Sequence, residues 1–496
     1  MSAERDLAER RARLTPAQRA LLARRLRNGA SGAANAEAED WSITPRPQPG
    51  PAPASFGQRR LFLLAISRPE SLAYNVYYAV SLRGSLDAAV LARSVRAVVE
   101  RHEALHTRFE TRDGEVLAVV APELIPTSLP LIDLSGLTAA ATREAEGLRI
   151  VGELATPRFD LRSGPPLRIA LLRAAPAEHF LLLAVHHVVI DGWTLALITR
   201  DLAQAYEDFA AGRRLSWRTR SLQSADFAHW QHRRVREGAL AEDLDWWRRH
   251  LAGAPPEGIS WPSRPQAAGG RAKLFLGPDL ARSLKAFAQR ERVTLFVTLL
   301  AGLDALLHHR TGETDLIVGT PLALRGQAEA AGIAGFLLNL LPLRTDLSGD
   351  PTFLDLLRRA RDTFLGALAH REPPIEWLAE ELLPARAPGS LPWIRVLFNM
   401  PSSDAGHTDP LQAGPLEIQP LLTGEMGSEF DWTFYARELA GDIRLDLGVN
   451  ANLLAPGEPA RLLEGFAALL AEITLRPQQR LSELAEAFTA PAGLEV

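Results

Sequence analysis

Residues 179–206 constrain the fold more than any other stretch of the chain, because they contain an apolar strand, a turn and a helix in succession. Phe180–Val185 is an apolar run of strand length, and Trp193–Tyr206 has apolar residues at helical spacing. Asp191 and Gly192 lie between them, where the chain must turn. Helix and strand patterns also alternate elsewhere, so the sequence predicts an α/β (α+β) fold.

Several other segments have clear patterns. Ser85 can cap a helix that ends near His106. The sequence after it, with Asp-Gly between two runs of strand residues, predicts a β-hairpin. The chain contains none of the GxxxxGK[ST], GxSxG or GxGxxG patterns, so nucleotide-binding and serine-hydrolase functions have no motif support. The predicted strands and helices are the hairpin strands Thr107–Thr111 and Val116–Val120, helices 279–290 and 294–309, and strand Leu316–Gly319.

A chain of 496 residues is too long for one ordinary core, so we expect two lobes, over 55–222 and 223–490. Apolar residues at helical spacing between charged ones predict an amphipathic helix over residues 1–28, which is either a solvated leader or a docking element for a partner. The initial Met and this leader suit a natural beginning of the protein. Residues 29–54 are rich in Ala, Gly and Pro, which is typical of a linker that need not pack.

The composition excludes several classes of function. The chain has no cysteine, which rules out disulfides, thiolate–zinc sites, iron–sulfur clusters and cysteine nucleophiles. Lys and Arg number 55 against 59 Asp and Glu, and this balance argues against binding to nucleic acid or to an anionic membrane. The N-terminus does not resemble a secretory signal, and no apolar run has the length of a membrane span. We therefore expect a cytoplasmic protein.

His186 and His187 stand at the end of the apolar strand, and successive strand side chains point to opposite faces. Only one of the two can therefore meet a substrate, while the other packs or supports its neighbour. A packed, hydrogen-bonded pair is the commoner use of adjacent histidines. The Asp191–Gly192 turn favours a functional site, because its carboxylate can hold the chain there.

The sequence His186–Gly192, HHVVIDG, resembles the HHxxxDG signature of the condensation domains of nonribosomal peptide synthetases, within the chloramphenicol acetyltransferase-like superfamily. Other stretches resemble further motifs of this family in the same order, over about residues 52–485. The chain departs from the family pattern at Gly57, Phe62 and His106, where the family usually has Ala, Trp and Arg. Residues 386–391 also depart from it, because they keep the leading Arg but lose the acidic and the second basic position. The matching stretches are Ser55–Phe62, Arg101–Phe109, Leu222–Gln231, Gly335–Arg344, His370–Glu376 and Arg386–Phe398.

The resemblance implies two acetyltransferase-like lobes in a V-shaped pseudo-dimer, with a tunnel between them and a carrier protein docking at each end. Such domains join a donor thioester on the phosphopantetheine arm of one carrier to an acceptor on another, forming an amide or an ester. A thioester is already activated, so we expect no bound cofactor or metal, and proximity supplies much of the catalysis. We expect a monomeric acyltransferase of natural-product or antibiotic biosynthesis, whose N-terminal helix can contact an upstream synthase.

The resemblance also assigns roles to the motif. His187 becomes the base, or the acceptor that positions the nucleophile, because imidazole accepts protons near neutral pH. His186 supports it from within the lobe. In this family the counterpart of Asp191 pairs with an arginine, for which Arg325 is the candidate, and a helix N-cap is an equally weighted and compatible role for Asp191.

Three further residues are candidates around the passage. Gly192 would let the backbone approach the tethered arm. Trp193 is either a channel wall or core, and core is the more common use of such a residue. Asn339, in the stretch that resembles the family's GxFVNT region, is a candidate for lining the passage.

Two other classes of function stay open. A coenzyme A-dependent acyltransferase or an epimerisation domain of the same superfamily is disfavoured, because Gly335–Arg344 and His370–Glu376 resemble condensation domains. A catalytically silent platform that recruits carriers or tailoring enzymes is also an alternative. The intact His187, Asp191 and Gly192 weigh against it, since silent relatives usually lose that histidine.

His102–His106 spells HExxH, the pattern in which two histidines one helical turn apart bind zinc. The metzincin continuation would need Gly and His where this chain has Phe109 and Arg112. Glu123, a downstream acidic residue, stands between prolines rather than on a helix. The pattern is therefore interpreted as a structural helix end, without a metal.

Overall fold

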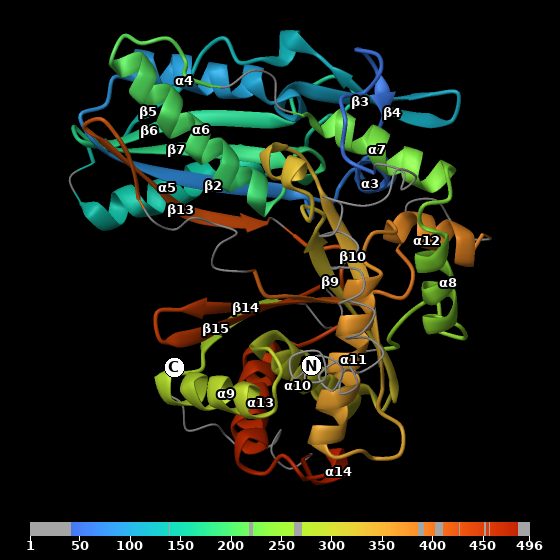
Figure 1. Cartoon of the computed structure of the whole chain (residues 1–496). Helices are drawn as coiled ribbons and strands as arrows, with labels where there is room; N and C mark the ends of the chain where they lie inside the picture. The colour runs from blue at the N-terminus through green and yellow to red at the C-terminus, as the bar shows by residue number, and fades with distance from the viewer. Residues whose placement is uncertain are drawn as a thin grey trace, which may run out of the picture.

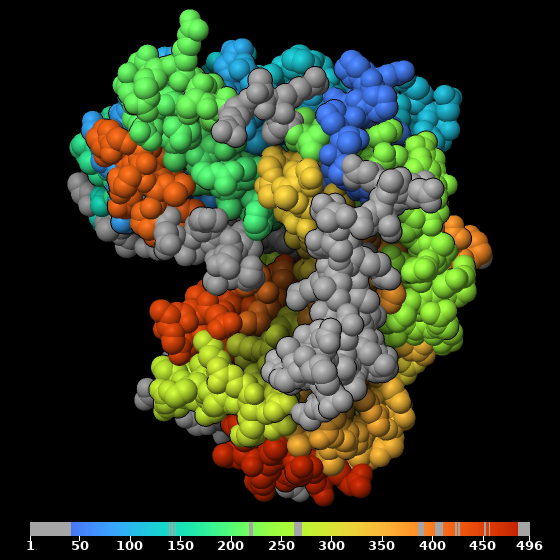
Figure 2. All heavy atoms as spheres, viewed as in Figure 1, coloured from blue at the N-terminus to red at the C-terminus, as the bar shows by residue number. Residues whose placement is uncertain are grey.

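The computed structural model describes residues 41–484, except for 138, 218–221, 262–269, 385–390, 402–409, 426, 451–452 and 456. The chain forms two lobes, each built on a six-stranded sheet. The lobes meet along one side and diverge on the other, in the V shape that the resemblance implies (Figure 1). Figure 2 shows a recess between the two lobes on the side where they diverge. The predicted leader helix, 1–28, lies outside the described residues.

The sheet of the first lobe is covered by helices on both faces. On one side α4 (Ala88–Arg101) and α6 (Gly192–Ala210) pack over it, and on the other α5 (Ala140–Ala155) does. A strand buried on both faces needs apolar residues at every position, which explains the uninterrupted apolar run in β7 (Glu178–His186). The strand order is β12 (Leu411–Ala413), β13 (Leu416–Glu425), β2 (Asn75–Gly84), β7 (Glu178–His186), β6 (Leu167–Ala175) and β5 (Leu131–Asp133).

Two strands of this first sheet come from the later part of the chain, within the predicted range of the second lobe. β13 pairs antiparallel with β2, and the register shifts between Pro420 and Leu422. β12 pairs with β13 in turn. This pair of strands, contributed by the later part of the chain, ties the lobes together by backbone hydrogen bonds.

The second lobe has a mixed sheet that packs against four long helices. α10 (Leu295–Thr311) is apolar on nearly all sides, because it lies inside this lobe with α13 (Glu458–Leu475) and α11 (Phe353–Ala369) against it. Among the described residues, no helix combines the length and the apolar character needed to cross a bilayer. The strand order is β10 (Leu338–Asp346), β9 (Asp315–Ala323), β11 (Val396–Asn399), β14 (Trp432–Leu439), β15 (Asp442–Val449) and β8 (Gly270–Phe275). The helices are α9 (Pro278–Arg290), α10 (Leu295–Thr311), α11 (Phe353–Ala369), α13 (Glu458–Leu475) and the short α14 (Leu481–Leu484).

Shorter helices join the lobes on the closed side of the V (Figure 1). Arg60 of the first of them binds Glu376 of the last at 2.9 Å, with both side chains largely buried. Arg234 pairs with Glu372 in the same region. These ion pairs connect segments that lie far apart in sequence. The helices are α3 (Phe56–Ser67), α7 (Ser224–Arg236), α8 (Ala241–His250) and α12 (Ile375–Leu382).

Residues 41–54, which the sequence places in a linker that need not pack, lie against the rest of the protein. Ile43 is 4% exposed, and β1 (Ala52–Pro53) pairs with β4 (Glu115–Val120) beside β3 (Thr107–Arg112). The prolines and alanines there are compatible with an edge strand, which needs few backbone donors.

The helix before the hairpin begins later than the sequence suggests. Asp87, rather than Ser85, caps α4, and its carboxylate accepts the backbone N–H groups of Ala89 and Val90 at 2.9 and 3.0 Å. The two residue types are comparable caps, so the choice depends on chain geometry. α4 ends at Arg101, and the chain continues as the 3₁₀ turn η1 (Glu103–His106).

Candidate active site

His187 begins a short 3₁₀ turn, η3 (His187–Val189), where β7 ends. Its backbone N–H donates to the carbonyl of Tyr74 at 2.8 Å, which fixes the start of the turn. Its ring atom Nδ1 lies 2.7 Å from the carbonyl oxygen of Ile190. A carbonyl only accepts, so Nδ1 carries the proton and Nε2 holds the lone pair of the neutral ring. This tautomer can accept a proton at Nε2.

The His187 ring is half-buried where the two lobes meet. The edge of the ring contacts Phe336, with centroids 5.4 Å apart and planes at 90°, and Phe336 precedes β10 of the second lobe. Tyr74, from the first lobe, lies at 6.4 Å on another side. The candidate base is therefore bordered by residues of both lobes.

His186 is more deeply buried than His187, with 5% of its surface exposed. Its Nδ1 accepts the backbone N–H of Val188 at 3.1 Å, and Phe159 packs edge-on against its ring. Burial, with a smaller contribution from His187, lowers the pKa of His186 to about 3. A ring that stays neutral and accepts from the turn supports η3, whereas the His187 ring contacts Phe336 at the other lobe.

Gln58 holds the same turn from the opposite side, and the sequence pattern assigns it no such role. Ser55 and Gln58 form a capping box at the start of α3. The Gln58 side-chain amide also donates to the carbonyl of Val188 at 3.2 Å. The Ser-x-x-Gln spacing was the signal for the cap, but the contact with η3 spans 130 positions and left no local signal.

Asp191 forms a buried ion pair with Arg325, with 2.8 Å between Oδ2 and the guanidinium and side-chain exposures of 0% and 4%. Its Oδ1 also accepts the backbone N–H and the hydroxyl of Thr194, both at 2.8 Å. Oδ2 accepts the backbone N–H of Leu337 at 3.2 Å. Asp191 is thus both the N-cap of α6 and an ion-pair partner.

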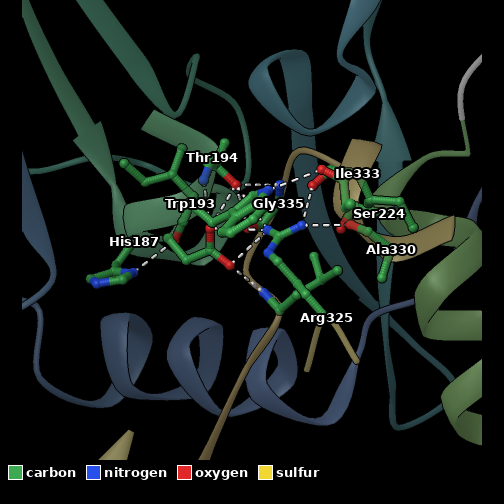
Figure 3. A network of polar contacts seen from close by, with 12 residues as sticks. His187, Trp193, Thr194, Ser224, Arg325, Ala330, Ile333 and Gly335 are labelled. Atoms are coloured by element: carbon green, nitrogen blue, oxygen red, sulfur yellow. Dashed lines mark hydrogen bonds and ion pairs between the residues drawn. The ribbon is translucent and has the colours of Figure 1, made fainter. Parts of the chain in front are cut away.

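Arg325 connects this carboxylate to the loop that follows it (Figure 3). Its guanidinium donates to the carbonyls of Ala330 and Ile333 at 2.8 and 2.7 Å. The single hydroxyl proton of Thr194 is shared between Asp191 Oδ1 and the carbonyl of Gly335, which lies 2.9 Å away, and the hydroxyl oxygen accepts the N–H of Gly335 at 3.0 Å. Thr194 and this loop were missed at the sequence level, because backbone partners are independent of side-chain identity.

Gly192 and Trp193 lie on the exposed first turn of α6. A Cβ at Gly192 would meet no atom of the described residues within 4 Å, so the fold itself does not demand glycine there. Trp193 is 37% exposed, and its Nε1 donates to the carbonyl of Ala331 at 2.9 Å. Trp193 is therefore not a core residue, and it bridges the two lobes.

Asn339 is buried, and its side chain forms hydrogen bonds with backbone groups. Its Nδ2 donates to the carbonyls of Arg371 and Pro373 at 2.9 and 2.7 Å, and its Oδ1 accepts from Ile375 at 3.0 Å. These contacts do not support a role in lining a passage. They make Asn339 the residue that fixes the chain entering α12.

The HExxH residues each bind a different protein group. His102 lies 2.9 Å from the carboxylate of Asp201, while Nδ1 of His106 faces the carbonyl of Val99 at 2.9 Å. His102 precedes the 3₁₀ turn η1 and His106 is its last residue, so the two histidines are not one turn apart on the face of an α-helix. Burial lowers the pKa of His106. His106 thus fills its position as a neutral, packed side chain.

Comparison with known proteins identifies the family. The condensation domain model matches residues 49–490, nearly the whole described chain. The chain belongs to the condensation domain family. The domain is 35% identical over 452 residues to a linear gramicidin synthase of Brevibacillus parabrevis, covering 89% of this chain but 6% of the relative. It is also 35% identical to phosphinothricin tripeptide synthetase PhsC of Streptomyces viridochromogenes, covering 97% of this chain and 44% of the relative. The domain thus spans less than half of each of these synthetases.

Solved structures share the two-lobe architecture. The X-domain from teicoplanin biosynthesis has a TM-score of 0.78 at 26% identity, over 89% of this chain and 99% of that one. The SgcC5 protein from Streptomyces globisporus has a TM-score of 0.72 at 27% identity, over 86% and 100%. The condensation domain therefore has the chloramphenicol acetyltransferase-like fold expected from its motifs. Condensation domains as a family are amide-forming acyltransferases of nonribosomal peptide synthesis.

Proposed function

We propose that this condensation domain joins an acyl or peptidyl thioester on one carrier protein to an acceptor on a second carrier, forming an amide or an ester. The observation that carries the proposal is the 2.7 Å contact between Nδ1 of His187 and the carbonyl oxygen of Ile190, which assigns the proton of the neutral ring to Nδ1. The acceptor nitrogen or oxygen bonds to the donor carbonyl carbon while its proton passes to Nε2. The carbon–sulfur bond then breaks, and the thiolate takes the proton back from the imidazole.

The surrounding residues position this base and do not react. The Asp191–Arg325 pair fixes the start of α6, and His186 and Gln58 hold η3. Gly192 leaves space next to the site for a phosphopantetheine arm. In this proposal the two arms enter from opposite ends of a tunnel between the lobes and meet at His187, and the domain acts as a monomer between carriers.

Reconstitution with two carriers tests the proposal. Candidate acyl groups are loaded on donor and acceptor carriers, and product is followed by intact mass spectrometry. We expect His187→Ala and His187→Gln to lower turnover by about 10²- to 10⁴-fold, the usual share of general acid–base catalysis. His309→Gln is the matched control, because His309 is exposed on α10. Turnover by His187→Gln equal to the parent would remove the base assignment. Transfer between coenzyme A-linked substrates without carriers would favour the acyltransferase alternative.

A second function has one observation in its favour. The X-domain resembles this chain, and a solved structure contains the X-domain in complex with OxyB. A domain that only recruits a partner protein would make no product with any loaded carrier pair. Its His187→Ala variant would bind carriers or a tailoring enzyme as well as the parent does. Product formation that depends on His187 excludes this function.

A further inference from the structure

Residues 41–46, which we call the strap, lie on the junction between the lobes, and they precede the residues that match the condensation domain model. The carbonyl of Trp41 accepts two hydrogen bonds from different parts of the protein. Trp230 of α7 donates its Nε1 at 2.6 Å, and Gln327, in the loop after β9, donates its Nε2 at 3.1 Å. The strap thus connects a helix with the loop that carries the partners of Arg325.

Arg46 anchors the other end of the strap. Its guanidinium binds Glu103 of η1 at 3.0 Å and Asp226 of α7 at 3.3 Å, and its backbone N–H donates to Asp226 at 2.9 Å. The Arg46 side chain is 8% exposed. A largely buried cation that shares two carboxylates holds its backbone in one place.

Ile43 lies between these anchors and packs into a small apolar cluster. α7 supplies one side of the cluster. The other side comes from the loop between β9 and β10. The buried members of the cluster are Ile43, Phe227, Trp230, Ala330, Ile333 and Leu337.

The three loop members of this cluster also hold the Asp191–Arg325 pair, through their backbones. Ala330 and Ile333 accept from Arg325 (Figure 3), and Leu337 donates to Asp191. Their side chains therefore belong to the cluster that contains Ile43, while their peptide groups bind the ion pair. Any shift of these side chains toward a space left by Ile43 moves the groups that bind Asp191 and Arg325.

We propose that the strap positions the loop 330–337, and through it the Asp191–Arg325 pair and the start of α6 next to His187. Ile43 and Arg46 are positioning residues in this proposal and do not touch substrate. As far as it concerns turnover, the inference rests on the proposed function. Residues that precede the family's own domain then help to set the geometry of its site.

Hydrogen–deuterium exchange of the full chain tests the inference without any substrate. The amides of Thr194, Gly335 and Leu337 donate within the network. We expect Ile43→Ala to speed exchange in the peptides that contain them by about tenfold, because a local opening that costs less is populated more. Ile150→Ala is the matched control: Ile150 is 6% exposed and belongs to a separate cluster under α5. It should lower thermal stability and leave exchange at the three amides as in the parent.

Ile43→Val keeps the fold if alanine does not, and it should give a smaller increase in exchange. The proposal would be overturned if both Ile43→Val and Ile43→Ala showed the same exchange as the parent at the three amides. In the carrier assay, Ile43→Ala should lower kcat by about tenfold with KM nearly unchanged, and Ile43→Val should restore most of it. An inactive parent would defeat the proposed function only, because the exchange result does not depend on turnover.

Discussion

Asp191 and Arg325 stand 134 positions apart in sequence and form one ion pair at 2.8 Å, with both side chains almost fully buried. Asp191 caps α6 of the first lobe, and Arg325 follows β9 of the second. The carboxylate that caps α6, two residues after the turn that contains His187, is therefore held by a residue of the other lobe. Changes at the junction should reach the site even where they are distant from His187.

Removing one member of this pair should destabilise the protein strongly. We expect Asp191→Asn or Arg325→Leu to cost about 3–5 kcal/mol, because the remaining group stays buried without its compensating charge. Urea unfolding of the parent and each variant measures this cost. The double variant should cost less than the sum of the two single changes.

The control is an exposed pair of the same type. Asp279 and Arg282 on α9 lie 2.9 Å apart, with side chains 96% and 73% exposed, so Asp279→Asn should barely change the unfolding curve. If Asp191→Asn were equally mild, the pair would not organise the junction.

The sequence predicted most of the local structure around the site, and its limits have a physical pattern. The strand, the turn and the helix of residues 179–206 follow from periodicity and an Asp-Gly pair, and all three are present. The ion pair of Asp191 with Arg325 was a candidate only through the family resemblance. Gln58 on η3 and Ile43 under the loop 330–337 were missed, because these contacts join distant segments.

The misplaced boundaries also have local causes. Ser85 and Asp87 are both good caps, and only the path of the chain from β2 decides between them. Residues 41–54 have the composition of a linker, yet Ile43 and Arg46 are enough to fix part of the segment. Composition averages over a segment, whereas docking depends on single side chains.

His186 should make the domain sensitive to acid. Burial lowers its pKa from the ordinary 6.5 to about 3, so the unfolded chain binds a proton that the folded chain refuses. The contribution of this histidine to stability is complete above pH 6.5 and is lost as the pH falls toward 3, by about 1.4 kcal/mol per pH unit at most. Urea unfolding at pH 7.5, 6.5, 5.5 and 4.5 should show a smaller loss for His186→Gln than for the parent. Parallel curves would mean that His186 becomes protonated in the folded state.

Asp304 should have the opposite pH dependence. This residue is buried inside the second lobe on α10, where burial raises its pKa from 3.8 to about 8 although Thr345 partly opposes the shift. The folded state keeps the proton that the unfolded state loses above pH 3.8, so this group's contribution is complete below pH 3.8 and is lost as the pH rises toward 8. Asp304→Asn should gain stability over the parent by up to about 1.4 kcal/mol per pH unit between about pH 5 and 8, measured by urea unfolding. A constant difference between the two proteins would show that Asp304 is ionised throughout.

Gly192 should matter to the substrate and not to the fold. A side chain there would project into space that the described residues leave open, so Gly192→Leu should keep the melting temperature of the parent. If the phosphopantetheine arm passes this position, the same variant should raise KM for the carrier-bound substrates by about tenfold or more, and Gly192→Ala should have a smaller effect. Gly152→Leu is the matched control, because Gly152 is also helical and also has no described atom within 4 Å of an added Cβ. An unchanged KM in Gly192→Leu would place the phosphopantetheine arm elsewhere, because a leucine in contact with the arm would weaken the binding of the carrier-bound substrate.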